Sequence, residues 1–309
     1  MLKRYELHNH TLESDAPQSC EELIEAMEKE GVDVFALTDH NTVSGHRKIR
    51  RLLEETPRHT RAVYGMEYTT YYGHILCQNL HTYVPWDSIN RHKPELLFEA
   101  CKASGALVGI AHPFAFGDPF ARGCRFEMDI TDFSSVDYIE IINNAQSMQE
   151  VNLYGIEWWE SLVLSGKHLA ATAGMDMHRE TDFAMKYATY IESNDGDPAG
   201  ELTAAIHACR TWVSNGMALK HEKTQDGTWR FTLEELHKPG FRPGEKYIMT
   251  LKSEAGEKEY DLTADGLTLT DEKLPNGDII IPKLYADKKE PENLVCVSPV
   301  IKNKKEIYL

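Results

Sequence analysis

The 309-residue sequence lacks features that would point to several classes of protein. No segment approaches the roughly 20 consecutive apolar residues that a helix needs to cross a bilayer. The six cysteines are scattered, with neither the spacing of a zinc ribbon nor that of a disulfide framework, which favours reduced thiols. Met1 to Arg4 lead directly into a histidine-bearing strand, without a signal-peptide pattern. We therefore expect a cytoplasmic protein with no membrane partner.

Basic residues are also scarce. The chain has 33 Lys and Arg against 49 Asp and Glu, a formal net charge of −16. Residues 216–309 carry a net charge of −2, whereas the preceding 215 residues carry −14 and hold twelve of the 14 histidines. Such an acidic body repels a polyanion at long range, so a nucleic acid polymer is not an expected partner. No internal repeat and no low-complexity run is visible.

The pattern of the chain changes near residue 215. Before it, short apolar strands alternate with helices, and capping boxes at Ser19–Glu22 and Ser147–Glu150 predict two helix starts. This βαβα succession implies a parallel sheet, open or closed as a barrel. After Gly216, short strand candidates are separated by turn signals such as Asn276-Gly277, which predicts a small all-β sandwich. We expect an α/β domain over residues 1–215 and an accessory β domain over 216–309, with a structural or oligomerising role.

Segment by segment, the pattern predicts strands at 5–9, 34–38, 61–69, 73–80, 107–111, 138–142, 169–172 and 211–214, with helices at 20–30, 47–55, 94–104, 147–165 and 201–208 between them. Beyond residue 216 it predicts strands at 229–233, 246–251, 259–262, 266–269, 278–281 and 294–298.

Metal-ligand residue types follow the predicted strands repeatedly. The first instance is Leu7-His8-Asn9-His10-Thr11, in which alternation along a strand places both imidazoles on one face. In a parallel barrel the carboxyl ends of the strands meet at one face, so ligands from several strand ends would converge there. Imidazole and carboxylate are ligands for Zn²⁺, Mn²⁺ or Fe²⁺. The motifs are His8-x-His10 with Asp15, Thr38-Asp39-His40, Gly65-Met66-Glu67, Gly73-His74, Ala111-His112-Pro113 and Gly174-Met175-Asp176-Met177-His178.

This run of motifs resembles the PHP (polymerase and histidinol phosphatase) superfamily over about residues 1–215. The segment Tyr71-Tyr72-Gly73-His74-Ile75-Leu76 resembles a Gly-His-x-x signature of the branch that contains small-molecule phosphoesterases and carbaryl hydrolases. The resemblance implies a distorted (β/α)₇ barrel, similar to a TIM barrel, with two or three divalent ions and a β-rich tail.

By the same resemblance, nine residues would be the metal ligands and hence the catalytic set. One ion would be held by His8, His10 and Asp176, and Glu67 would bridge it to a second ion held by His74 and His112. Asp15, His40 and His178 would hold a third. Asp15 stands where some relatives carry His, and Asp39 could instead orient a ligand imidazole.

The expected chemistry is attack by a metal-bound hydroxide, because divalent ions lower the pKa of bound water to about 7. Arg179, next to His178, is the best-placed cation for a phosphate, and Arg122 and Arg125 lie in a segment after His112 that we expect to cover the site. The leading hypothesis is a phosphoesterase acting on a small phosphorylated metabolite such as a nucleotide.

Two alternatives remain open. The same ligand set could hydrolyse a carboxylic ester, carbamate or amide. Alternatively, the chain could be a metal-binding scaffold or regulatory module, with its β domain binding a partner or a second copy.

Overall fold

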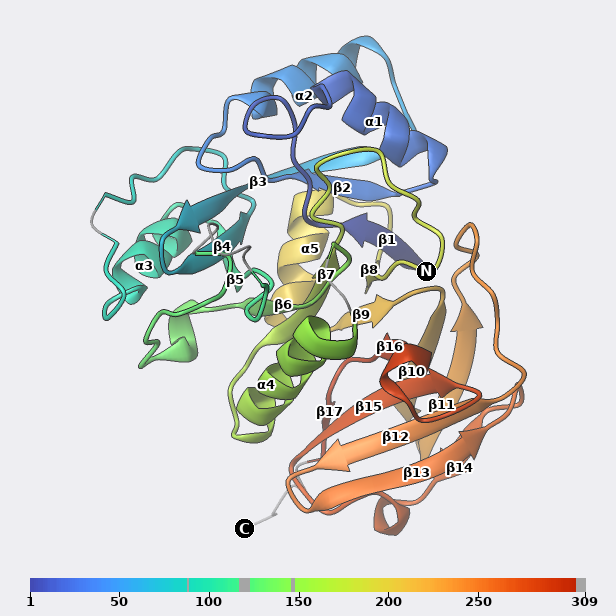
Figure 1. The fold of residues 1–309 in the computed structure, drawn as a ribbon. Coiled ribbons are helices and arrows are strands. Elements are labelled where there is room, and N and C mark those ends of the chain that lie inside the picture. Colours follow the sequence, from blue (N-terminus) through green and yellow to red (C-terminus); the bar gives the residue numbers. More distant parts are fainter. Residues whose placement is uncertain (88, 117–122, 146–147, 304–309) are drawn as a thin grey trace.

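The computed structural model describes residues 1–87, 89–116, 123–145 and 148–303. Strands and helices alternate in its first two thirds, as the mixed α/β prediction requires (Figure 1). The elements of this part are β1 Leu2–Glu6, α1 Cys20–Lys29, β2 Val34–Leu37, α2 Gly45–Glu55, β3 Arg61–Thr70, β4 Gly73–Gln78, α3 Glu95–Ala103, β5 Leu107–Ile110, β6 Tyr138–Asn143, α4 Leu153–Leu164, β7 Ala170–Gly174, β8 Ala188–Glu192, α5 Pro198–His207 and β9 Thr211–Ser214.

The sheet of this part is mixed, which corrects the expectation of a parallel one. Its order runs β9-β8-β1-β2-β3-β4-β5-β6-β7. The pairs β1–β2, β2–β3, β5–β6 and β6–β7 are parallel, whereas β4 is antiparallel to both β3 and β5, and β8 to both β1 and β9. Strand β4 must run antiparallel because only Tyr71 and Tyr72 separate it from β3, and so short a connection permits only a hairpin. Strand β8 was not predicted.

The sheet curves around helix α5. One hydrophobic cluster receives side chains from every strand from β1 to β8 and from Leu202 and Ile206 of α5. Helices α1 and α2 cover a second cluster over β2, and α3 and α4 cover a third over β4 to β7. Side-chain hydrogen bonds join β8 and β9 to β7, the strand at the far end of the sheet order. Thr189 of β8 donates to the Ala173 carbonyl at 3.0 Å, and Thr211 of β9 donates to the Ala171 carbonyl at 2.7 Å. A closed barrel stays a prediction.

The two predicted capping boxes have different outcomes. Ser19 and Glu22 cap each other reciprocally at the start of α1, as predicted. Ser147 of the second box lies outside the described residues, and a π-helical turn over Met148–Asn152 precedes α4. None of the helices in the described part of the chain is both long and apolar enough to span a bilayer. All six cysteines are free thiols.

The chain after β9 consists of strands and two short 3₁₀ helices within the described residues. A three-stranded sheet, β10-β11-β14, shares a core with β12, β15 and β16, and Figure 1 shows these strands gathered at the lower right. Because β16 pairs with β9, the main sheet runs on past residue 215, and a domain boundary there remains a proposal. The strands are β10 Met217–Lys223, β11 Trp229–Glu235, β12 Tyr247–Ser253, β13 Gly256–Leu262, β14 Leu267–Leu269, β15 Ile279–Ala286, β16 Leu294–Val297 and β17 Ile301–Lys302.

Gly109 in β5 is required by close packing. A Cβ at this position would lie 2.2 Å from the ring of Tyr138, which is fully buried and donates a 2.6 Å hydrogen bond to the Leu76 carbonyl. We expect Gly109→Ala to lower the free energy of unfolding by about 1–3 kcal/mol, the usual cost of overpacking a core. Urea denaturation measures it. Gly200→Ala in α5, where the nearest atom is 3.3 Å away, is the matched control; equal stability of the two variants would contradict the prediction.

Candidate metal centre

The two histidines after β1 lie side by side in the interior. His8 and His10 are both fully buried, and their ring centroids are 5.0 Å apart. Between them, Asn9 turns the other way and donates hydrogen bonds to the carbonyls of Glu6 and Ala36, at 3.1 and 3.0 Å. The extended His-x-His segment therefore directs both rings to the same side, as its spacing predicts.

Glu67 of β3 lies at the centre of the cluster and is fully buried. Both of its carboxylate oxygens contact imidazole nitrogens from other strand ends. Oε2 lies 3.1 Å from His8 Nε2, 3.4 Å from His10 Nε2 and 2.9 Å from His40 Nδ1, while Oε1 lies 2.8 Å from His74 Nδ1 and 3.1 Å from His112 Nε2. Five imidazoles therefore surround one carboxylate.

The strand arrangement explains how these side chains meet. His40 forms an isolated parallel bridge with Glu67, next to the end of β2. His74 is near the start of β4, and because β4 is antiparallel to β3, this start lies beside the end of β3, with His74 opposite Thr69. His112 follows β5 in a left-handed backbone conformation, with φ of 25°. Neighbouring strand ends thus deliver one imidazole each.

Asp176 and His178 follow β7 and complete the set. Asp176 Oδ1 lies 3.1 Å from His10 Nε2 and 3.5 Å from His178 Nδ1, and Asp176 Oδ2 accepts a 3.0 Å hydrogen bond from Asn143. Asp15 lies on the outer side, 3.3 Å from His178 and 3.6 Å from His40. The side chains of Asp15 and His178 are 55% and 37% exposed, so solvent reaches the cluster from their side.

The donor atoms form three groups, in each of which all atoms lie within 4.8 Å of one another. Glu67, His10 and His40 each belong to two of the groups. The groups differ from the predicted partition in two ways: His40 stands beside Glu67 and His74, where His112 was expected, and His10 joins Asp15, His40 and His178. His112 remains at 3.1 Å from Glu67. The groups are His8, His10, Glu67 and Asp176; His40, Glu67 and His74; and His10, Asp15, His40 and His178.

These residues fit divalent metal ions. The buried atoms His8 Nε2 and Glu67 Oε2 have no hydrogen-bond partner among the described residues, and neither has His10 Nδ1. Buried polar atoms without partners are costly, and a cation bound between His8 Nε2 and Glu67 Oε2 would satisfy both atoms at once. Nitrogen and carboxylate donors suit Zn²⁺, Mn²⁺ or Fe²⁺.

The protonation states of Glu67, His74 and His112 follow from their burial and from the contacts between them. Burial raises the pKa of Glu67, but His8 and His74 outweigh burial and hold that pKa well below its usual range. Burial lowers the pKa of His74 below its ordinary value. For His112 burial also lowers the pKa, but contact with Glu67 outweighs it and raises the pKa to about 9.

Two polar residues that the sequence did not single out support the ligands. Glu140 of β6 is buried; its Oε1 lies 2.9 Å from His8 Nδ1 and its Oε2 accepts a 3.0 Å hydrogen bond from the His112 amide. It fixes His8 so that Nε2 faces Glu67. Asn143 bonds Asp176 at 3.0 Å and Glu140 at 3.2 Å. The sequence signal that could have identified Glu140 is its place as the single acidic residue in the apolar run Tyr138–Ile142.

Asp39 orients a loop and not an imidazole, which corrects the alternative role considered for it. Its carboxylate accepts hydrogen bonds of 2.6 and 2.8 Å from the Thr11 amide and hydroxyl, and one of 2.8 Å from the Ser14 hydroxyl. It therefore holds the segment that carries Asp15.

The expected substrate-binding arginines do not contact the ligand set within the described residues. Arg179 is exposed and lines a cavity of about 410 Å³ with Glu22, Glu25 and Lys29 of α1. Arg125 is exposed and lies 5.8 Å above the ring of Phe114. Arg122 lies outside the described residues. A phosphate-binding role for the three arginines stays a prediction.

Comparison with known proteins gives one related sequence and several structures. No family model matches the chain. An uncharacterized protein of Methanocaldococcus jannaschii is 29% identical over 154 residues, covering 45% of this chain and 80% of that protein. Two solved structures align with 57–58% of the chain: a candidate metal-dependent phosphoesterase from Bifidobacterium adolescentis (16% identity, 89% of that chain, TM-score 0.41) and an amidohydrolase from Chromobacterium violaceum (15% identity, 87% of that chain, TM-score 0.42).

A third structure matches nearly the whole chain. It is a two-domain protein from Bacteroides vulgatus containing a predicted PHP-like metal-dependent phosphoesterase, with a TM-score of 0.57 and 13% identity over 97% of this chain and 95% of that one. The chain thus has a PHP-like fold, and the resemblance to the PHP superfamily is confirmed at the level of the fold.

The two acidic ligands should differ in how many ions they hold. Glu67 belongs to two donor groups and Asp15 to one. We expect Glu67→Gln to lower the bound metal by two ions per chain and Asp15→Asn by one. Elemental analysis of desalted, Mn²⁺-loaded protein measures both, and equal loss in these matched carboxylate-to-amide variants would contradict the bridging role of Glu67.

Metal affinity should rise with pH. His112 in the metal-free protein is raised from an ordinary pKa of 6.5 to about 9, so near pH 7 its Nε2 carries a proton that an incoming ion must displace. We expect Mn²⁺ affinity to increase between pH 7 and pH 9, roughly up to the pKa of His112, and calorimetric titrations should show proton release. His112→Asn should give a shallower dependence; an unchanged slope would exclude His112 as the source.

Proposed function

We propose that the protein is a metal-dependent hydrolase, and specifically a phosphoesterase acting on a small phosphorylated metabolite. The observation that carries the proposal is the buried Glu67 carboxylate, whose two oxygens contact five imidazoles. Burying an ionised group in this way is costly unless the groups around it compensate the charge. The predicted phosphoesterase of the Bacteroides vulgatus protein with the same fold favours phosphate as the reacting group.

Each part of the cluster has a separate task in this proposal. His8, His10, Glu67 and Asp176 would hold one ion, Glu67, His74 and His112 a second, and Asp15, His40 and His178 a third. When bound, divalent ions neutralise phosphoryl oxygens and make water ionise near neutral pH.

The surroundings of three inner ligands, His10, His74 and Asp176, prepare them for this role. Burial lowers the pKa of His10 and of His74, so their rings are neutral at pH 7 and offer a lone pair. Burial raises the pKa of Asp176, but His8 and His10 outweigh it and keep the carboxylate ionised. The exposed Asp15 and His178 leave the outer group open to solvent, which gives the substrate its route of approach.

A carboxylic ester, carbamate or amide is the second candidate substrate. It is favoured by the absence of Lys or Arg contacts to the nine ligands among the described residues, because a phosphate dianion normally attracts such cations. The third possibility is a non-catalytic metal-binding module. A cytoplasmic location, the identity of the ions and oligomerisation through the β part stay predictions.

The test is hydrolysis of p-nitrophenyl phosphate and p-nitrophenyl acetate by Mn²⁺-loaded protein. We expect phosphate release that falls more than about 100-fold in Glu67→Gln, beyond the range for losing an outer-shell contact. Ester cleavage without phosphate release would favour the second candidate. Metal binding without turnover of either substrate would favour the module.

A further inference from the structure

An aromatic cavity of about 470 Å³ is lined in part by residues that follow His112 in the chain. We use this name for the space whose walls come from the segment after β5 and from α4. This volume is within the range of pockets that bind small molecules. Its aromatic and aliphatic walls include Pro113, Phe114, Phe126, Phe133, Trp158 and Leu162.

The rings of the cavity are arranged around Trp158. The centroids of Phe114, Phe126 and Phe133 lie 5.9, 6.1 and 6.1 Å from the Trp158 ring, at tilted or edge-on angles. All four side chains are only partly buried, although Phe126, Phe133 and Trp158 also pack against the core. Ring surface therefore remains available to a further aromatic group.

Two direct connections join this cavity to the metal ligands. Pro113 and Phe114 follow His112 in the chain. Phe126 lies against Gly73, where an added Cβ would be 2.8 Å from the Phe126 backbone and 2.9 Å from its ring, and Gly73 precedes His74. The Phe126 amide also donates a 3.0 Å hydrogen bond to the Pro113 carbonyl. Parts of its wall are therefore held by residues next in the chain to His74 and His112, the two imidazoles on Glu67 Oε1.

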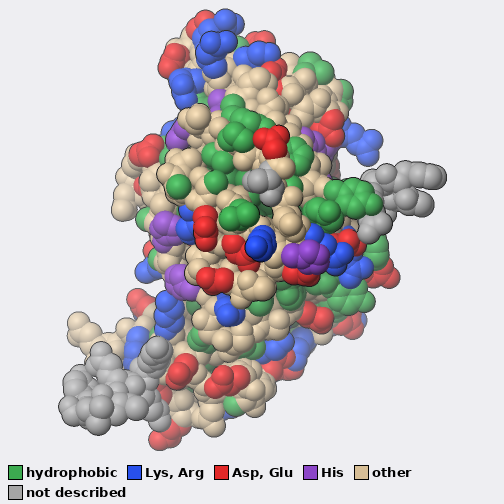
Figure 2. Space-filling view, turned by 90° about the vertical axis from the view of Figure 1, so that its left-hand side faces the viewer, with side chains coloured by type: hydrophobic (Ala, Val, Ile, Leu, Met, Phe, Trp, Pro, Cys, Tyr) green, Lys and Arg blue, Asp and Glu red, His purple; other side chains and the backbone are tan. Residues whose placement is uncertain are grey.

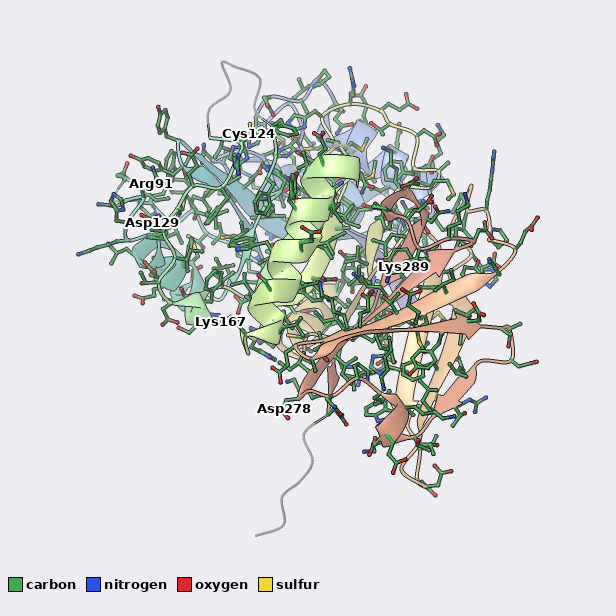
Figure 3. All side chains as sticks on the ribbon, turned by 60° about the horizontal axis from the view of Figure 1, so that its bottom comes forward. Arg91, Cys124, Asp129, Lys167, Asp278 and Lys289 are labelled. Atoms are coloured by element: carbon green, nitrogen blue, oxygen red, sulfur yellow. The ribbon has the colours of Figure 1, made fainter. Side chains whose placement is uncertain are left out.

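The residues of the cavity wall indicate which part of a substrate it would accept. Among the described residues Asp129 is its one charged lining residue, and the Arg125 guanidinium lies 5.8 Å from the ring of Phe114, which forms part of the wall. The Asp129 carboxylate lies 2.6 Å from His92 Nδ1, and the Asp129 amide bonds the Arg91 carbonyl at 2.9 Å, on the α3 side of the molecule (Figure 3). The aromatic and aliphatic walls suit an uncharged ring.

Exposed aromatic side chains also lie on two connections that carry or adjoin ligands and on α4. Tyr71 between β3 and β4, Phe116 after β5 and Tyr154 at the start of α4 are 56, 60 and 51% exposed. The Tyr154 and Phe114 rings are 6.0 Å apart, which connects an exposed ring to the cavity wall. Figure 2 shows apolar side chains in patches on the side of the molecule that carries α3 in Figure 1.

We propose that the aromatic cavity binds an aromatic ring of the substrate while the phosphoryl group lies at the metal centre, so that the substrate class is phosphoesters with an aromatic body. This inference rests on the proposed function, which it deepens. Hydrolysis would place water oxygen on phosphorus and release the aromatic alcohol from the phosphorus–oxygen bond that breaks.

The test compares phenylphosphonate with methylphosphonate by calorimetry on Mn²⁺-loaded protein, since neither compound is an ester that the protein could hydrolyse. Trp158→Leu removes the central ring, and Leu162→Trp fills the cavity without removing a ring. Tyr260→Leu, a partly buried aromatic on β13 at the other end of the main sheet, is the matched control. The wild type and the control should prefer phenylphosphonate roughly tenfold, and both cavity variants should lose that preference while binding methylphosphonate unchanged.

The outcomes separate this inference from the proposed function. A phenyl preference that survives in both cavity variants, no preference in the wild type, or no binding of either phosphonate would overturn the aromatic cavity as a binding site. Hydrolysis of phenyl phosphate and ethyl phosphate is measured in parallel. A phenyl preference without hydrolysis would support the aromatic cavity as a binding site and contradict the phosphoesterase activity. Hydrolysis that the cavity variants do not change would support the activity and contradict the binding site.

Discussion

The site depends on one buried charge. Glu67 is an ionised carboxylate with no solvent exposure, and it can remain so only because five imidazoles surround its oxygens. Those imidazoles come from the ends of β1, β2 and β5 and from the start of β4, so the charge can be compensated only if these four strand termini meet at the same place. Glu140, in turn, holds His8 through Nδ1. The electrostatic requirement of one side chain therefore constrains the arrangement of half the sheet.

The curvature of the sheet around α5 satisfies that requirement. Strands β1 to β8 all contribute to the cluster that packs on α5, and the ends of β1, β2, β3, β5 and β7 meet the start of β4 at one side of the molecule. The antiparallel β4 is part of this solution, since its orientation places His74 opposite Thr69 and next to Glu67. Left-handed backbone at His112 and Asp176 marks the positions where the chain must turn sharply to present a ligand.

The chain after β9 is connected to the ligand region as well as to the sheet. Two hydrogen bonds join it to the segment that follows His178. The Lys238 ammonium donates to the Phe183 carbonyl, and the Tyr187 hydroxyl donates to the Leu294 carbonyl. On α4, the buried Glu160 pairs with Lys252 and Lys283 of β12 and β15. These contacts support a structural role for the β part, because they fix the loop and the helix that border the site and the aromatic cavity.

The sequence by itself determined the identity of the donors and the alternating order of most strands and helices. Donor chemistry belongs to a residue type, and the short apolar runs that precede His8, His40 and His112 are local signals. The tertiary structure alone decided that β8 runs antiparallel, that His40 joins Glu67 and His74, that Asp39 holds a loop, and that Glu140 and Asn143 support the ligands. These outcomes arise from contacts between residues far apart in the chain, which local periodicity does not encode.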